Sequence, residues 1–250
     1  MPPTLVPHAT PSRAQQVLTF TEHLEELRRR LGICLLAVLA GAVISWRFGD
    51  RVLLWLRRPA GELLPRFAFF SPTEAFAAYM KLAVACGVAL AMPVILYQLW
   101  SFVRTALTWR ERAYALAFGI WGTVLFVLGA WCAYAWCLPL FLKFLLGIGQ
   151  PYLEPVISIT RYLSFVLGML VTCGVLFEMP LVIFMLARLG ILAPDVLQRH
   201  RAAALLVLLV VAAIVTPTTD AVSLLVLTAP LVVLYEVSIL VARLASRTSR

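Results

Sequence analysis

The chain alternates between long apolar runs and short polar connections. Six runs approach the roughly 20 residues that a helix needs to cross the hydrocarbon core of a bilayer. They lie at residues 31–46 (preceded by an amphipathic lead-in at 20–30), 76–102, 113–138, 162–189, 202–215 and 221–240. None has the short alternating pattern of an outer-membrane β-barrel strand. The pattern therefore predicts an all-α polytopic membrane protein with six transmembrane helices.

The fifth and sixth predicted helices differ from the other four. Only fourteen uncharged residues lie between Arg201 and Thr216, which gives about 21 Å of helix against a hydrocarbon core of about 30 Å. The sixth helix follows almost at once, through Thr216-Pro-Thr-Thr-Asp220. Because so short a connection forces neighbouring helices to run antiparallel, we expect helices five and six to form a short hairpin.

The remaining segments predict three domains and two ordered loops. Residues 1–19 contain four prolines and no apolar core, so we expect a disordered tail there. Residues 20–244 form the predicted six-helix domain, and residues 245–250 a short basic tail. Prolines interrupt the loops at about 47–75 and 139–161, and we expect both loops to form ordered caps on the membrane surface.

Composition and charge narrow the class of protein further. The chain is 62% hydrophobic and 13% charged, with a mean hydropathy of +0.95, which excludes a soluble enzyme. The net charge of +9 does not indicate nucleic-acid binding, because the basic residues are distributed between the apolar runs instead of forming one face. Thirteen Lys and Arg residues fall on the side of the termini and seven on the other, which favours a cytoplasmic location for both termini. The exception is the first loop, which contains Arg47, Arg51, Arg57, Arg58 and Arg66.

Glu178 is the most informative single residue, because it lies inside the apolar stretch 166–186 with Pro180 two positions later. An ionised carboxylate there costs at least about 2.5–3.5 kcal/mol unless it faces a polar cavity or is protonated. One interpretation is a polar feature of a groove that binds a partner or takes part in a proton path. The other is a structural pair with another polar residue of the bundle.

Two further carboxylates lie at the expected cytoplasmic boundary. Glu26 belongs to the amphipathic segment 20–31, and Glu111 lies between Arg110 and Arg112 in the second loop. One interpretation is an interfacial helix and a local ion pair that contributes little at a surface. If Glu111 instead faces outward beside Glu26, the two form an acidic site suited to a cationic peptide, because guanidinium and carboxylate groups match as a fork.

Catalytic and metal-binding patterns are not evident. The chain has no Walker-type, HExxH or GxSxG segment, its five cysteines lie in apolar runs without CxxC spacing, and its three histidines are scattered. We therefore expect no cofactor, no metal and no enzymatic activity. The main alternative is a proton-coupled small-molecule transporter that uses Glu178, although no internal repeat supports it.

Several motifs follow one another in order along residues 20–244. They are His23-Leu-Glu-Glu-Leu-Arg-Arg-Arg-Leu31, Ser71-Pro-Thr-Glu-Ala-Phe76, Pro93-Val-Ile-Leu-Tyr-Gln-Leu-Trp-Ser-Phe102, Glu111-Arg112, Tyr162-Leu-Ser-Phe165, Phe177-Glu-Met-Pro180, Thr216-Pro-Thr-Thr-Asp220 and the segment from Pro230 to Glu236. As an ordered set they resemble the motifs of the TatC family, the receptor subunit of the twin-arginine protein translocase.

This resemblance implies a fold and a recognition site. The fold would be a curved wall of six transmembrane helices with a concave face and both ends in the cytoplasm. Glu26 and Glu111 would bind the paired arginines of a signal peptide on folded cargo, with Arg28, Phe102 and Arg112 nearby. Glu178 would match the family's carboxylate in the concave groove, whereas Pro59 and Asp220 would make cap or partner contacts.

The resemblance also implies partners and a location. Single-span subunits of the TatA/TatB type would gather around the receptor, which would form a homo-oligomer within the complex and contact membrane lipid but no nucleic acid. The location would be the bacterial plasma (inner) membrane, and the proton gradient would drive export.

Overall fold

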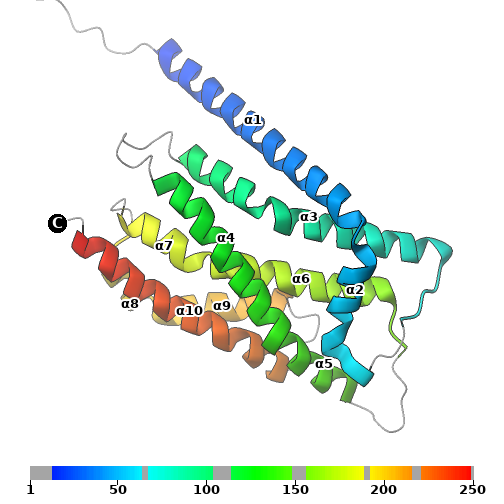
Figure 1. The fold of residues 1–250 in the computed structure, drawn as a ribbon. Helices are drawn as coiled ribbons and strands as arrows, with labels where there is room; N and C mark the ends of the chain where they lie inside the picture. The colour runs from blue at the N-terminus through cyan, green and yellow to red at the C-terminus, as the bar shows by residue number, and fades with distance from the viewer. Residues whose placement is uncertain are drawn as a thin grey trace, which may run out of the picture.

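Helix α1 (Arg13–Trp46) is one continuous element that contains both the amphipathic lead-in and the first predicted transmembrane helix. The chain then turns into α2 (Gly49–Arg57), inclined by 82° to α1, so α2 runs across the bundle instead of along it (Figure 1). The structure is a computed structural model and describes residues 13–63, 67–103, 114–147, 156–188, 192–215 and 221–248.

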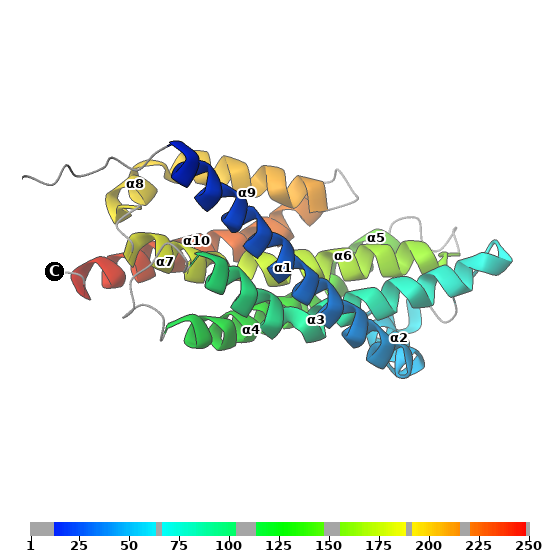
Figure 2. The same cartoon turned by 90° about the horizontal axis from the view of Figure 1, so that it is seen from above.

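The later helices run back and forth along the bundle (Figures 1 and 2). In chain order they are η1 (Arg58–Leu63), α3 (Pro72–Val103), α4 (Tyr114–Cys132), the π-helical turn η4 (Ala133–Cys137), α5 (Leu138–Gly147), α6 (Ile159–Phe177), α7 (Met179–Arg188), α8 (Pro194–Arg199), α9 (Arg201–Val215) and α10 (Ala221–Thr248). We call the end with α2, η1 and the starts of α3 and α6 the cap end. The opposite end, where α1 begins and α10 finishes, is the tail end.

The all-helical prediction is confirmed for the described residues. The predicted number of six spans is confirmed only in part. Four stretches there are long and apolar enough to cross a membrane: Pro72–Phe102, Phe118–Gly147, Ile159–Arg188 and Leu224–Leu244. A fifth appears if α1 and α2 count as one bent span. The predicted fifth helix is present as α9, which packs beside α10 and is shorter than these stretches.

Three predicted boundaries differ from the structure. α1 begins at Arg13, inside the expected disordered tail 1–19, because residues 13–19 contain no proline and extend the amphipathic lead-in. Helix continues through Pro139 to Gly147, where the third loop was expected. The π-helical turn before Pro139 relieves the clash between a proline ring and the carbonyl four residues earlier. α10 also continues to Thr248, into the expected tail 245–250.

Direct hydrogen bonds fasten the two cap segments to each other. Ala68 and Ser158 form an isolated bridge, in which the Ala68 N–H donates to Ile157 O at 3.1 Å and the Ile159 N–H donates to Ala68 O at 3.0 Å. Glu74 accepts hydrogen bonds from the Ser158 hydroxyl and from the Phe70 N–H. The predicted ordered caps are therefore joined into one unit in the described residues.

Two tyrosine hydroxyls hold the carboxyl end of α2. Tyr134 of η4 donates to Trp55 O, and Tyr162 of α6 donates to Leu56 O, both at 2.8 Å. These carbonyls belong to the last turn of α2, and Trp55 O also accepts a hydrogen bond from the Arg58 N–H. The Tyr134 ring also stacks on Trp55, with centroids 3.8 Å apart. α2 is thus fixed to two of the long helices.

The buried core follows the same helices. Its larger cluster joins α2, α3, α5, α6, α9 and α10, and it includes Leu56, Leu82, Phe141, Val166, Leu208 and Leu231. A second cluster lies between α3, α4 and α7, with Met92, Leu96, Trp100, Phe118, Phe126 and Met185. Most of residues 24–46 of α1, by contrast, are exposed, as expected of a helix that contacts lipid on most of its surface.

α1 attaches to α3 where two glycines meet. A Cβ added to Gly41 would lie 2.8 Å from Gly87 O, and one added to Gly87 would lie 2.6 Å from Val38 O. The two backbones can approach this closely only because neither residue has a side chain. The glycine pair therefore sets the distance between α1 and the rest of the bundle.

Replacing Gly87 with valine is expected to lower the free energy of unfolding by about 1–3 kcal/mol, because α1 must move away from α3. Unfolding in mixed detergent micelles measures the change. Gly32→Val is the matched control, since it alters helix propensity in the same way and a Cβ at Gly32 meets no atom within 4 Å. Equal effects of the two substitutions would show that the Gly41–Gly87 contact does not set the packing.

Candidate functional site

Glu26 lies on α1 near the tail end of the bundle, and an arginine of its own helix holds it. Both Nε and Nη2 of Arg30 donate to Glu26 Oε1, the first at 3.1 Å. Arg30 Nη1 also lies 3.4 Å from the backbone oxygen and from the side-chain Oε1 of Gln98 on α3. One guanidinium is therefore surrounded by acceptors from two helices.

The other predicted residues of this region fall partly within the described structure. Arg28 is exposed on α1, two residues from Glu26, and Phe102 is half-buried in the last turn of α3. Glu111 and Arg112 lie outside the described residues, as does Asp220. Whether Glu26 and Glu111 meet therefore stays a prediction. Residues 104–113 connect the end of α3 to the start of α4, and both helix ends lie at the tail end with Glu26 (Figure 1).

Glu178 occupies the junction between α6 and α7. It follows the last residue of α6 and precedes Pro180, and the backbone stays hydrogen-bonded there: the Glu178 N–H donates to Val175 O, and Glu178 O accepts from Leu181 and Val182. The residue is 7% exposed, and its Oε1 has no hydrogen-bond partner among the described residues. The predicted structural pair is therefore not found for this atom in the described part of the chain.

Gly122 of α4 makes room for the Glu178 carboxylate. A Cβ at Gly122 would lie 2.9 Å from Glu178 Oε2 and 2.7 Å from Leu96 Cδ1. The carboxylate is therefore packed between α3, α4 and α7 in an apolar setting. Sequence reasoning missed Gly122, because a glycine in an apolar run shows no sign of the residue that packs on it.

Trp100 is a second polar group that sequence reasoning missed. Its indole Nε1 is buried and has no hydrogen-bond partner among the described residues. The same is true of Glu178 Oε1. Trp100 follows Leu96 by one helical turn on α3, and Leu96 contacts the same Gly122 position as Glu178. Leu96 and Trp100 both belong to the cluster between α3, α4 and α7. Unsatisfied polar groups of this kind are uncommon in protein interiors, which marks this cluster as a candidate for function.

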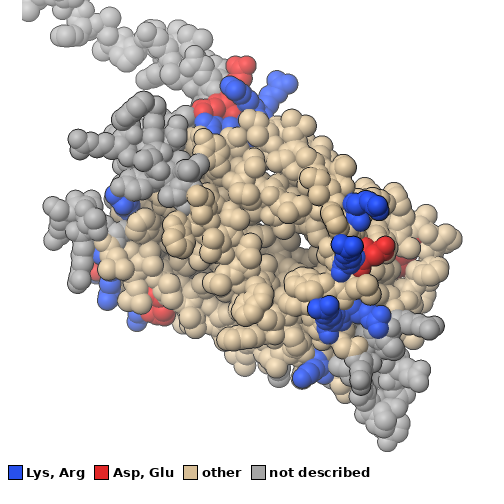
Figure 3. All heavy atoms as spheres, in the orientation of Figure 1, with Lys and Arg blue, Asp and Glu red and all other residues tan. Residues whose placement is uncertain are grey.

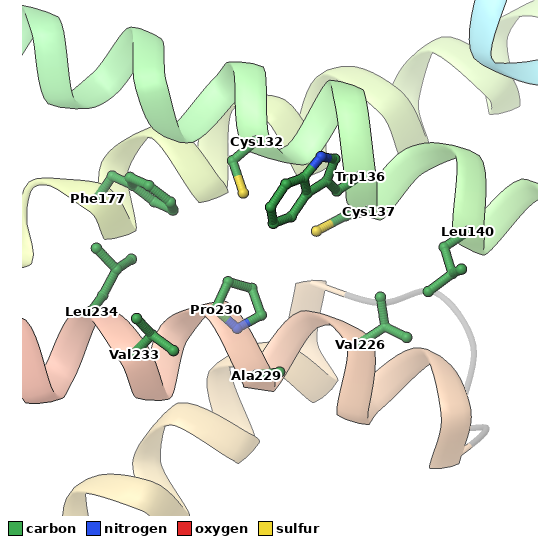
Figure 4. Close-up of a pocket in the computed structure, with 10 residues that line it drawn as sticks. All are labelled: Cys132, Trp136, Cys137, Leu140, Phe177, Val226, Ala229, Pro230, Val233 and Leu234. Carbon is green, nitrogen blue, oxygen red and sulfur yellow. The ribbon is translucent and has the colours of Figure 1, made fainter.

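An apolar pocket of about 540 Å³ opens beside the end of α6. Figure 4 shows it between Cys132, Trp136 and Cys137 on one side and Pro230, Val233 and Leu234 of α10 on the other. Phe177, the residue before Glu178, forms part of the wall (Figure 4). The pocket has the size and apolar lining of a site for a hydrophobic ligand segment.

Pro59 lies away from these groups, at the cap end. It is half-buried in η1, which packs against α5. As for metal ligands, no three His, Cys, Asp or Glu side chains lie together in the described parts of the chain.

Comparisons with known proteins agree with this architecture. Residues 22–230 match the family model described as "Sec-independent protein translocase protein (TatC)". The chain is 38% identical over 226 residues to TatC of Carboxydothermus hydrogenoformans, covering 90% of this chain and 93% of that protein. It is also 38% identical over 237 residues to TatC of Aquifex aeolicus, covering 93% of this chain and 98% of that one.

A solved structure gives the same result. The crystal structure of a twin-arginine translocase receptor, TatC, superposes with a TM-score of 0.80 at 38% sequence identity, over 90% of this chain and 100% of that chain. The motifs in order, the helical architecture and the matches in sequence and structure lead to one conclusion. The chain belongs to the TatC family of Sec-independent protein translocase proteins.

Proposed function

We propose that this chain is the receptor that binds the paired-arginine signal peptides of folded proteins and nucleates the export complex. Family membership supports a receptor role in translocation. The observation that carries the proposal is the Arg30 guanidinium held between Glu26 Oε1 and the two oxygens of Gln98. Those acceptors suit a guanidinium, and a signal arginine would displace Arg30 from them. Glu111 would take the second arginine, with Arg28, Phe102 and Arg112 nearby.

The proposed topology has six spans and both termini in the cytoplasm of a bacterial plasma membrane. α1 begins and α10 ends at the same end of the bundle (Figures 1 and 2). Two ends on one side of a membrane require an even number of crossings. α9 must then count as a crossing beside the four long stretches and the bent pair, although it is short. The membrane next to α9 would be thinner, or residues that flank α9 would reach the interface.

The apolar part of the signal peptide would enter the bundle beside Glu178, where the pocket lined by Phe177 offers apolar contact. Single-span partner subunits would then gather around the complex, with Pro59 and Asp220 among the cap or partner contacts. More than one copy of the receptor would assemble, and the proton gradient would supply the energy.

Replacing Glu26 with glutamine is expected to weaken binding of a twin-arginine signal peptide about tenfold or more, because hydrogen bonds to charged groups contribute about 1.5–3 kcal/mol. Fluorescence anisotropy with the purified full chain in detergent measures the affinity. Glu25→Gln is the matched control, an exposed neighbour on the same helix, with an expected change below about twofold. Glu111→Gln is expected to resemble Glu26→Gln.

Removing the Arg30 guanidinium is a second test, and it is expected to change peptide affinity in the opposite direction. Arg30→Gln frees Glu26 and is expected to strengthen binding by up to about fivefold, since surface ion pairs contribute at most about 1 kcal/mol. A peptide with two lysines is expected to bind more weakly, because an ammonium group cannot form the fork. Unchanged affinity in both Glu26→Gln and Glu111→Gln would overturn the proposed site.

Glu178 Oε1, which has no hydrogen-bond partner among the described residues, supports one rival function, a proton-coupled solute transporter. An experiment with vesicles that contain the purified chain alone distinguishes the transporter from the receptor. Solute flux driven by a pH gradient and lost in Glu178→Gln would favour the transporter. Signal-peptide binding without such flux would favour the receptor.

A further inference from the structure

The cap end carries an unusual concentration of positive charge. Arg47, Arg51, Arg57 and Arg58 lie on or beside α2, and Figure 3 shows Lys and Arg side chains gathered at this end of the face. None of the four forms an ion pair with a carboxylate whose side chain the structure describes. Nearby acids have other partners: Asp50 accepts a hydrogen bond from the Tyr79 hydroxyl, and Glu74 accepts one from the Ser158 hydroxyl.

An apolar groove of about 390 Å³ lies beneath α2. Val52 and Trp55 of α2 form its roof, and small residues of α3 and α4 form much of its wall, among them Ala89 and Ala130. Trp55 and Trp131 line the groove and are 41% and 58% exposed. Half-exposed tryptophans of this kind are typical of the boundary between headgroups and acyl chains. The groove is therefore apolar inside, and two half-exposed tryptophans line it.

The register of α2 places two arginines next to the tryptophan that lines this groove. Arg51, Trp55 and Arg58 are spaced i, i+4 and i+7, so they share one face of the helix. Arg51 Cζ lies 5.9 Å from the centre of the Phe48 ring, within cation–π range. Arg51 of α2 and Arg58, the first residue of η1, thus lie about one turn on either side of the tryptophan that lines the groove. A ligand there would meet positive charge at its head and apolar surface along its tail.

We propose that this groove binds one anionic phospholipid from the leaflet next to α2, with an acyl chain under Trp55 and the phosphate between Arg51 and Arg58. Guanidinium groups match a phosphate diester as a fork, and the apolar lining matches an acyl chain. The volume is in the range of small-ligand sites. A transmembrane helix, with a diameter of about 10–12 Å, does not fit beneath α2. Lys and Arg are otherwise few on the side of the bundle away from the termini, and the site gives the arginines of the first loop a role there.

Native mass spectrometry of the full chain tests this proposal with phosphatidylglycerol and phosphatidylcholine of identical acyl chains. We expect phosphatidylglycerol to be retained in preference. Arg51→Gln with Arg58→Gln is expected to weaken retention about 25-fold, or about fivefold for each arginine. Arg161→Gln is the matched control, an exposed arginine at the same end on α6, and is expected to have no effect.

A second variant separates a built site from general surface charge. Ala89→Leu keeps every arginine and fills the groove, so it is expected to reduce phosphatidylglycerol retention while the chain stays monodisperse. A brominated acyl chain is expected to quench wild-type fluorescence more than that of Trp55→Phe. Equal retention of the two lipids, or unchanged retention in both the double arginine variant and Ala89→Leu, would overturn the proposal. The proposal would also be overturned if the apolar segment of a signal peptide, and no lipid, changed the fluorescence of Trp55.

Discussion

Replacing Gly129 with leucine is expected to lower the free energy of unfolding by about 3 kcal/mol or more, a larger loss than that expected for Gly87→Val. A Cβ at Gly129 would lie 2.6 Å from Phe177 Cγ and 2.7 Å from Cys173 O. The second contact is with backbone, so side-chain rotation cannot relieve it. Overpacking of a well-filled core typically costs about 1–3 kcal/mol, and here α4 and α6 must also separate.

Thermal unfolding of the purified chain in detergent measures this loss. Gly168→Leu is the matched control, because Gly168 lies on α6 and a Cβ there meets no atom within 4 Å. We expect the control to unfold within about 0.5 kcal/mol of the wild type. If Gly129→Leu were as stable as Gly168→Leu, the close contact between α4 and α6 at Gly129 would be wrong.

Replacing Glu178 with leucine is expected to raise the free energy of unfolding by about 2 kcal/mol and to abolish export. The carboxylate is 7% exposed and packs against Gly122 and Leu96. Its Oε1 has no hydrogen-bond partner among the described residues. A buried polar group without a partner costs about 1–3 kcal/mol, and an apolar side chain of similar size removes that cost. A residue that lowers stability in this way persists when it serves function.

Two measurements, unfolding in mixed micelles and export of a twin-arginine reporter in cells, check this prediction together. Glu236→Leu is the control, because Glu236 is exposed and pairs with Arg201 at 2.8 Å. We expect Glu236→Leu to change stability by less than about 1 kcal/mol. A destabilised Glu178→Leu chain would show that the carboxylate has a stabilising partner, and normal export would remove its proposed role.

Much of the helix arrangement could be predicted from the sequence, because apolar runs of membrane length have few alternatives. The predicted runs 76–102 and 202–215 agree closely with α3 and α9. Pro139 misled the prediction of the third loop, since a proline is tolerated after a π-helical turn that the sequence does not signal. The start of α1 at Arg13 was also missed, because only Pro11 and the residues before it disfavour helix.

The candidate site could be predicted only residue by residue. Glu26 and Glu178 stand out because carboxylates are rare in such a chain, so they are visible without a structure. The groups that surround them are not visible in that way. Gln98 and Gly122 come from other helices, and neither residue type signals its partner. Arg30 is visible as one of three adjacent arginines, but only the fold shows which of them reaches Glu26.

The hydroxyl bonds from Tyr134 and Tyr162 to the last turn of α2 have a mechanical consequence. They tie a crosswise helix to η4 and α6, which continue into the interior of the bundle. A displacement of α2 is therefore expected to move the start of α6, which Tyr162 joins to it. Because α6 is a continuous helix that ends next to Glu178, we expect part of that displacement to reach the carboxylate at its far end.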